Sequence, residues 1–146
     1  MKKFILVLLS LSLLTGCGLL EEANNSLTYV EEMTDYLNEA EQFANDFPAL
    51  VENASANSSA LPELEGRLND MKSEIEEINN LTPPSMAEDI HAKVTDYNNK
   101  ALQGIEQAQT QIDKGEVSLS ELQSLEVVKT FNQLQEIKGN LENLGQ

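Results

Sequence analysis

The sequence contains few of the side chains from which active sites and metal centres are usually built. Among 146 residues there is one cysteine, one histidine and no tryptophan. A single cysteine excludes an intrachain disulfide, and a single histidine excludes a carboxylate di-metal site with two imidazole ligands. Phosphate-binding glycine loops, EF-hand spacing and a Gly-x-Ser-x-Gly turn are also absent, so nucleotide, tight calcium and serine-hydrolase sites lack support. We therefore predict no catalytic, cofactor-binding or metal-binding residue, and we interpret the protein as a non-enzyme.

Basic side chains are scarce as well, with 9 lysines and arginines against 25 acidic residues. Without Lys2 and Lys3, which belong to a segment that we expect to be removed, 7 basic and 25 acidic side chains give a formal charge of −18. Such a surface repels nucleic acid and anionic lipid headgroups, which excludes nucleic-acid binding and membrane attachment through a basic patch. The acids are spread along every segment, which is typical of a solvated surface. Attraction of cationic partners or loosely held divalent ions remains the alternative.

No apolar run is long enough to cross a bilayer as a helix, which takes about 20 residues. The longest run, residues 4–14, follows two lysines and precedes small residues, the layout of a secretory signal peptide. Leu14-Thr15-Gly16-Cys17 resembles the bacterial lipobox, in which lipid is added to the cysteine and the signal is cut just before it. We therefore predict lipid attachment at Cys17; the alternative is an ordinary secretory signal with an incidental cysteine. Two acyl chains, at about 0.8 kcal/mol per buried methylene, anchor a protein stably.

These features predict how the chain is divided and where it is located. Residues 1–16 are expected to be a cleaved signal peptide, 17–25 the lipidated cysteine with a short tether, and 26–146 a helical bundle domain. The mature protein is expected at the cell membrane, on its extracytoplasmic face, held by lipid on Cys17. It is also expected to be a monomer, because one domain of this size can bury enough surface to be stable alone.

The apolar residues recur at steps of three and four along four stretches, the period of an amphipathic helix. The expected helices span residues 26–47, 61–78, 85–114 and 118–144. Pro48 is expected to end or kink the first helix, with a short continuation to about residue 53, and the polar residues 53–60 are expected to form a mobile loop. Patterns typical of strands are absent. The sequence therefore predicts an all-α fold, an antiparallel bundle of about four helices.

Short motifs mark some of the expected helix ends. Residues 85–88 and 118–121 match the capping box Ser-x-x-Glu, and Gly115 is a plausible helix stop. The expected core positions are Leu20, Ala23, Leu27, Val30, Leu37, Ala40, Ala44 and Phe47 in the first helix, Leu61, Leu64, Leu68, Met71, Ile75 and Ile78 in the second, Met86, Ile90, Val94, Tyr97, Ala101, Ile105, Ala108 and Ile112 in the third, and Leu122, Leu125, Val128, Phe131, Leu134, Ile137, Leu141 and Leu144 in the fourth.

Two groups of residues carry a functional and a structural interpretation. Glu88 and His91 form the Glu-x-x-His half of a carboxylate di-metal motif, but Glu88 is also the capping partner of Ser85, which favours a partly exposed surface histidine. The aromatic residues of the first helix could line a ligand groove, although packing is the commoner role at helical spacing. They are Tyr29, Tyr36, Phe43 and Phe47.

Several of these features together resemble a family of small lipoproteins from Bacillus-type Gram-positive bacteria. They are the double-lysine start, the lipobox, Asn24-Asn25-Ser26, Thr82-Pro83-Pro84 and the Glu-Asp-x-His at residues 88–91. The resemblance implies a lipid-anchored helical protein on the outer face of the cytoplasmic membrane, with no assigned activity. We expect a non-enzymatic interaction or structural module that contacts an envelope protein or cell-wall component. The alternatives are a small-ligand or cation-binding lipoprotein and, third, a carboxylate-metal enzyme.

Overall fold

The fold is a bundle of α-helices, and the computed structural model describes the backbone of residues 16–115 and 126–142 and the side chains of residues 25–115 and 128–139. The α-helices in these ranges are α2 (Gly16–Ala56), α3 (Leu61–Asn79), α4 (Glu88–Asp113) and α6 (Glu126–Glu142). Two single turns of 3₁₀ helix, η1 (Ser58–Ala60) and η2 (Ser85–Ala87), precede α3 and α4. The described ranges contain no strand. The predicted all-α class is therefore confirmed.

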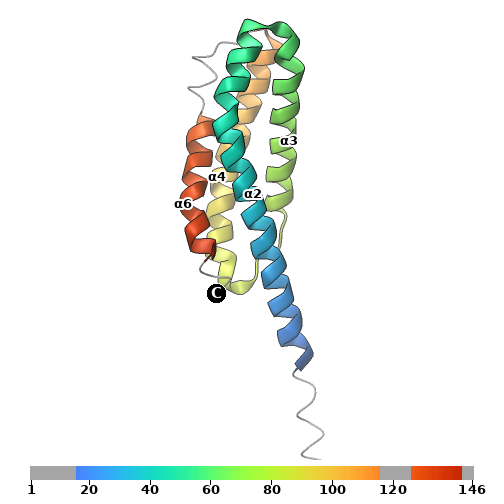
Figure 1. Cartoon of the computed structure of the whole chain (residues 1–146). Helices are drawn as coiled ribbons and strands as arrows, with labels where there is room; N and C mark the ends of the chain where they lie inside the picture. Colours follow the sequence, from blue (N-terminus) through green and yellow to red (C-terminus); the bar gives the residue numbers. More distant parts are fainter. Residues whose placement is uncertain (1–15, 116–125, 143–146) are drawn as a thin grey trace, which may run out of the picture.

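The four helices lie side by side and alternate in direction (Figure 1). Contacts run in a ring, because α2 packs against α3 and α6, and α4 packs against the same two helices. The predicted antiparallel bundle is confirmed. At its amino-terminal end α2 extends beyond the bundle (Figure 1). The first helix was expected to begin at residue 26, whereas α2 runs unbroken from Gly16. The division into signal peptide, tether and domain remains a prediction.

Helix α2 also continues past the position where the sequence predicts an end or kink. Pro48 lies inside the helix, although its ring removes one backbone hydrogen bond. The next buried residues after Phe47 are Val51 and Ala54, so the same apolar stripe continues beyond the proline, and its packing offsets the lost bond. The predicted loop over 53–60 was too long, because the helical backbone between α2 and η1 is interrupted at Asn57. The side-chain oxygen of Asn57 accepts a hydrogen bond from the backbone amide of Ser59 at 3.1 Å.

The ends of α4 give one wrong prediction and one confirmed prediction. The prediction of a capping box at residues 85–88 was wrong, because the N-cap of α4 is Ala87 and no side chain caps it. The acidic residues in the first turn of α4 instead interact favourably with the positive end of the helix dipole. The predicted stop at Gly115 is confirmed. Its φ is +73° and its amide donates to the Ile112 carbonyl at 2.9 Å, a left-handed end that glycine adopts without strain. The second capping box lies outside the described residues.

The core is one cluster that all four helices share. Its centre is aromatic: the ring of Phe43 stacks on Phe47 at 5.3 Å between centroids and meets the edge of Phe131 at 5.3 Å. Since Phe131 belongs to α6, these rings join the first and last described helices. The buried apolar residues are Tyr29, Met33, Tyr36, Leu37, Ala40, Phe43, Ala44, Phe47, Val51, Ala54, Leu64, Leu68, Met71, Ile75, Ile78, Ala87, Val94, Ala101, Ile105, Ala108, Ile112, Phe131, Leu134 and Ile137.

Most expected core positions with described side chains are buried, and the two that are exposed have a common cause. Leu27 and Met86 were predicted to be buried but are 63% and 56% exposed. Leu27 precedes Tyr29, the first buried residue described in α2, and Met86 lies in the connection before α4, so both sit where the bundle ends. Five expected positions are only partly buried, namely Val30, Leu61, Ile90, Tyr97 and Val128. The side chains of the remaining expected positions, Leu20, Ala23, Leu122, Leu125, Leu141 and Leu144, lie outside the description.

Candidate functional site

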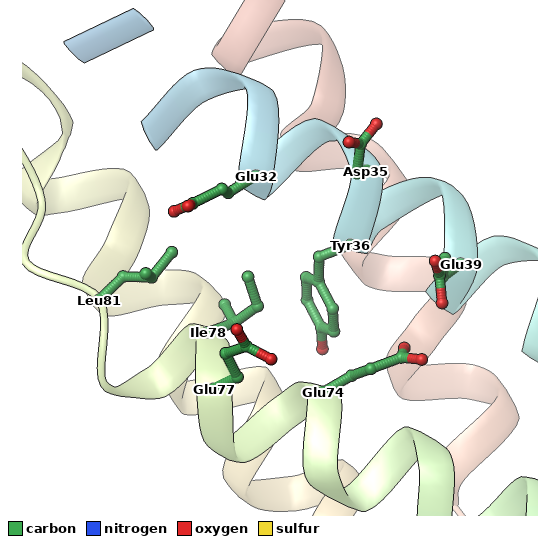
Figure 2. A pocket seen from close by; sticks show the side chains of 8 residues that line it. All are labelled: Glu32, Asp35, Tyr36, Glu39, Glu74, Glu77, Ile78 and Leu81. Atoms are coloured by element: carbon green, nitrogen blue, oxygen red, sulfur yellow. The ribbon is translucent and has the colours of Figure 1, made fainter. Parts of the chain in front are cut away.

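A groove lined by acidic residues lies between α2 and α3 on the described surface. Its volume is about 220 Å³, and we call it the acidic groove (Figure 2). Five of its eight lining residues are acidic and none is basic. The lining residues are Glu32, Asp35, Tyr36 and Glu39 from α2, and Glu74, Glu77, Ile78 and Leu81 from α3 and the residues after it. Negative side chains thus surround a floor that is aromatic and aliphatic.

The groove follows from helical spacing on two faces that meet. On α2, Asp35, Tyr36 and Glu39 follow Glu32 by three, four and seven positions, which places them on one side of the helix. On α3, Glu77 and Ile78 follow Glu74 by three and four positions. Each helix alone looks like an amphipathic helix with a charged border. The groove arises because the charged border of α2 packs beside that of α3.

Glu74 is the most perturbed acid of the groove. Burial raises its pKa from the usual 4.5 to about 7, and a hydrogen bond with Glu39 and the negative charges of Glu39 and Asp70 act in the same direction, while Arg67 opposes them. The Oε2 atom of Glu74 is buried, and none of the described residues donates a hydrogen bond to it. A carboxyl in this setting holds its proton to near neutral pH.

Beneath the groove a polar relay connects three helices inside the core. The Tyr36 hydroxyl of α2 donates to Oδ1 of Asn98 on α4, and Nδ2 of Asn98 donates to Oδ1 of Asn79 on α3 at 2.8 Å. Asn98 is fully buried. Burial also raises the pKa of Tyr36 well above its usual range, so the hydroxyl remains a donor. Sequence analysis missed Asn98, although its step of four from Val94 and three to Ala101 places it on the buried face.

The relay makes the side chain of Asn98 important for stability. Replacing Asn98 with alanine should leave the Tyr36 hydroxyl without its acceptor and Oδ1 of Asn79 without its donor, at a cost of about 1 to 3 kcal/mol in the free energy of unfolding. Urea unfolding measures this loss. Asn99→Ala, at the exposed neighbouring position, is the matched control. Equal stability of the two variants would show that the relay contributes nothing.

Comparison with known proteins identifies the family. The model of the "Family of unknown function (DUF6376)" matches residues 29–144. The chain belongs to this family. It is also 32% identical over 148 residues to the uncharacterized lipoprotein YybP of Bacillus subtilis (strain 168), and the match covers 100% of both chains. No solved structure matches. The resemblance to Bacillus-type lipoproteins is thereby confirmed, and the relative supports a lipoprotein of unknown function.

In this DUF6376 chain the only histidine is engaged by a tyrosine. Nδ1 of His91 lies 3.1 Å from the Tyr29 hydroxyl, and the two ring centroids are 5.8 Å apart. Burial lowers the pKa of His91, which a hydrogen bond with the backbone of Asn79 partly opposes. His91 is half-buried, in agreement with the predicted partly exposed histidine, and Glu88 is exposed. Within the described residues no group of three or more His, Cys, Asp or Glu side chains is arranged to hold a metal ion.

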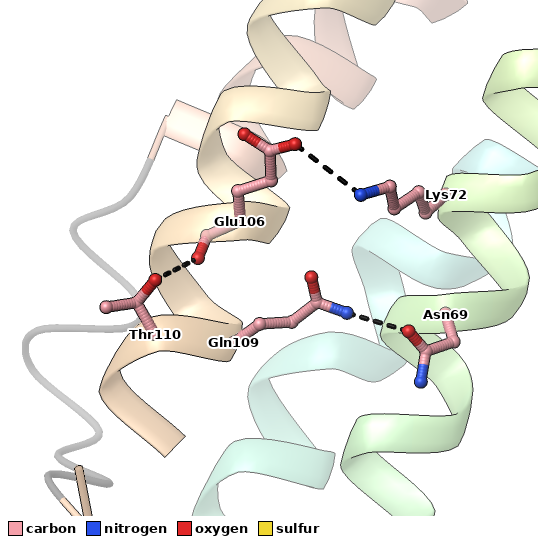
Figure 3. A network of polar contacts seen from close by, with 5 residues as sticks. All are labelled: Asn69, Lys72, Glu106, Gln109 and Thr110. Carbon is pink, nitrogen blue, oxygen red and sulfur yellow. Dashed lines mark hydrogen bonds and ion pairs between the residues drawn. The ribbon is translucent and has the colours of Figure 1, made fainter. Parts of the chain in front are cut away.

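On another side of the DUF6376 bundle, polar contacts join α3 to α4 (Figure 3). Nζ of Lys72 lies 3.5 Å from Oε1 of Glu106, and Gln109 donates to Oδ1 of Asn69 at 2.8 Å. The Thr110 hydroxyl bonds the backbone carbonyl of Glu106 at 2.8 Å. Exposed contacts of this kind contribute little stability. We interpret this network as surface packing between neighbouring helices.

The predicted lipid attachment residue lies far from the acidic groove along the same helix. Cys17 is in the first turn of α2, and that end of the helix projects from the bundle (Figure 1). Lipidation itself remains a prediction. None of the helices in the described part of the chain is sufficiently long and apolar to span a membrane.

Proposed function

We propose that the mature chain is a lipoprotein on the outer face of the cytoplasmic membrane, anchored by lipid on Cys17, and that it acts by binding an envelope protein or cell-wall component. The observation that carries this proposal is the position of Cys17 at the projecting end of α2. Acyl chains attached there can enter the bilayer while the bundle stays in water. The match to a lipoprotein over the whole of both chains supports the same anchor.

The distance between anchor and bundle follows from helix geometry. Cys17 precedes Tyr29, the first buried residue described in α2, by 12 residues. At 1.5 Å per residue this segment is about 18 Å long if it stays helical. The bundle then stands clear of the lipid headgroups, which is consistent with a surface of formal charge −18 that anionic lipids repel.

A binding role is favoured over catalysis by the chemistry of the described clusters. The acidic groove brings together carboxylates and one tyrosine, with no serine, cysteine or histidine beside them to act as nucleophile or base. Nδ1 of His91 bonds the Tyr29 hydroxyl, and His91 does not line the groove. This arrangement supports a module that recognises partners through shape and charge.

The proposal is tested by palmitate labelling of the wild-type chain in a Gram-positive host, with and without globomycin, followed by membrane fractionation. We expect label in the membrane fraction and accumulation of the unprocessed precursor when globomycin is present. In vivo crosslinking would then identify the envelope partner. An unlabelled protein recovered from the medium would contradict the proposal.

Binding of a small organic cation is a second candidate function, and the composition of the acidic groove favours it. Carboxylates surround the ring of Tyr36 and the side chains of Ile78 and Leu81, a combination that suits an amine with a short apolar chain. The volume of about 220 Å³ is below that of most drug-sized pockets, about 300 to 1,000 Å³. The groove therefore suits one amine side chain or a molecule of similar size.

This second candidate is tested by titrating methyl-labelled protein with n-butylammonium chloride and, as the control for ionic strength, with sodium chloride. We expect saturable shifts of the Ile78 and Leu81 methyl signals with the amine alone, and none at Ile105 in the core of α4. Identical shifts with both salts would exclude a specific amine site.

A further inference from the structure

We propose that the contact between α2 and α3 is sensitive to pH: one proton held between the carboxyls of Glu39 and Glu74 closes it, and loss of that proton loosens it. This inference does not depend on the proposed anchor, and it concerns two of the carboxyls that line the proposed amine site. It rests on the way in which two acids from different helices meet at the acidic groove.

The geometry places the two carboxyls against each other. Glu39 projects from α2 and Glu74 from α3, and their carboxyl groups point toward one another (Figure 2). The buried Oε2 of Glu74 receives no hydrogen bond from the part of the chain that the structure describes. Two ionised carboxylates repel each other and cannot form a hydrogen bond, whereas one proton converts them into a short, charge-assisted O–H···O⁻ pair. A shared proton thus supplies the donor that the buried oxygen lacks.

The charged groups on Glu39's and Glu74's own helices also favour the proton. On α2, Glu32 and Asp35 line the same groove, and on α3 it is lined by Glu77. Asp70 adds negative charge near Glu74, and Arg67 is the cation that opposes it. Negative charge therefore outweighs positive charge around the pair.

Among the described residues, Arg67 of α3 is the cation that lowers the pKa of Glu74, and the described parts of α4 and α6 add none. From α4 the side chain that reaches this region is Asn98, which is uncharged and bonded to the Tyr36 hydroxyl. On α6, which packs against α2, Nζ of Lys138 lies 2.6 Å from Oδ1 of Asn38 and 3.8 Å from Oε2 of Glu41. Within the described residues, a proton is thus the positive charge that can lie between the two acids, with Arg67 acting on Glu74 from the same helix.

The direction of the pH effect follows from linkage. Because the pKa of Glu74 is about 7 in the folded protein and 4.5 without its surroundings, the folded state binds more protons than the unfolded state between these values. The stabilisation is complete below pH 4.5 and is lost as the pH rises through about 7. Between pH 4.5 and about 7, titration of Glu74 raises the unfolding equilibrium constant by at most about tenfold per pH unit. The rise is smaller than this limit because solvent screens the charge of the exposed Glu39.

The test compares thermal unfolding of three full-length mature chains between pH 5 and pH 8. The wild-type melting temperature should fall across this range. In Glu74→Gln the amide donates to Glu39 at every pH, so the curve should be flatter and the melting temperature at pH 8 higher than that of the wild type, by roughly 3 to 8 °C. Glu77→Gln, which removes the same charge from the same groove, should retain the slope of the wild type.

A direct titration keeps the proposal testable even if a variant folds poorly. In wild-type protein labelled at the glutamate carboxyl carbon, the Glu74 signal should titrate near pH 7. A Glu74 midpoint near 4.5 would overturn the proposal. So would a flattening by Glu77→Gln as large as that by Glu74→Gln, because the pH effect would then reflect total charge.

Discussion

Replacing Cys17 with serine should abolish palmitate incorporation completely while the bundle remains folded. The thiol is the only group in the chain that can form the thioether to the lipid, because there is one cysteine. Cys17 lies 12 residues before Tyr29, the first buried residue described in α2, so the substitution leaves the described core unchanged. Labelling and precursor processing report the anchor, and circular dichroism and thermal unfolding report the fold.

The controls for this variant separate loss of lipid from loss of export. Asn25→Ser, in the same projecting part of α2, should keep both the label and the globomycin-sensitive processing. Without lipid the precursor can stay at the membrane through its uncut signal, so labelling and processing are the decisive measurements. Palmitate on the Cys17→Ser protein would place the lipid elsewhere and refute the anchor assignment.

Replacing Phe43 with alanine should lower the free energy of unfolding by about 3 to 5 kcal/mol, a larger loss than that expected for Asn98→Ala. The ring is fully buried and contacts both Phe47 and Phe131 at 5.3 Å between centroids. Its removal leaves a cavity between α2 and α6 and takes the aromatic contacts from both neighbours. Because single domains are stable by about 5 to 15 kcal/mol, the variant should be close to unfolding at physiological temperature.

Urea unfolding of Phe43→Ala beside Asn45→Ala measures this effect. Asn45 is exposed two positions further along α2, so its replacement changes helix composition without touching the core. We expect the control to differ from the wild type by about 0.5 kcal/mol or less. A loss below about 1 kcal/mol for Phe43→Ala would mean that α6 does not pack on this ring as described.

The sequence predicts the helices well because each has a clear apolar stripe. On α3 the steps of three and four are unbroken, and Leu64, Leu68, Met71, Ile75 and Ile78 are all buried. The boundaries are less predictable, because packing between helices overrides local preferences. Pro48 favours a break, yet the stripe on both sides of it is buried and the helix continues. The serine of the expected capping box is taken up in a 3₁₀ turn.

The two parts of the candidate site differ in how far the sequence reveals them. Lipid attachment at Cys17 is predicted from contiguous residues, because the lipobox is a local motif, and it remains a prediction. The acidic groove depends on which face of α2 meets which face of α3, and acids on a single helix are indistinguishable from ordinary solvated charges. Asn98 was missed for a similar reason: the buried position was assigned to the neighbouring apolar Tyr97, and only the fold shows that Tyr36 and Asn79 supply its partners.

For a chain anchored through Cys17 as proposed, the continuity of α2 determines which proteolytic cuts release a folded domain. One unbroken helix carries Cys17 at its start and the buried residues from Tyr29 onward. A protease that cuts between residues 18 and 25 would release the described core intact, whereas a cut beyond Tyr29 would separate part of the core from the rest. The position of a single cleavage in α2 thus decides whether a folded domain is shed into the surroundings or a damaged one is left to be degraded.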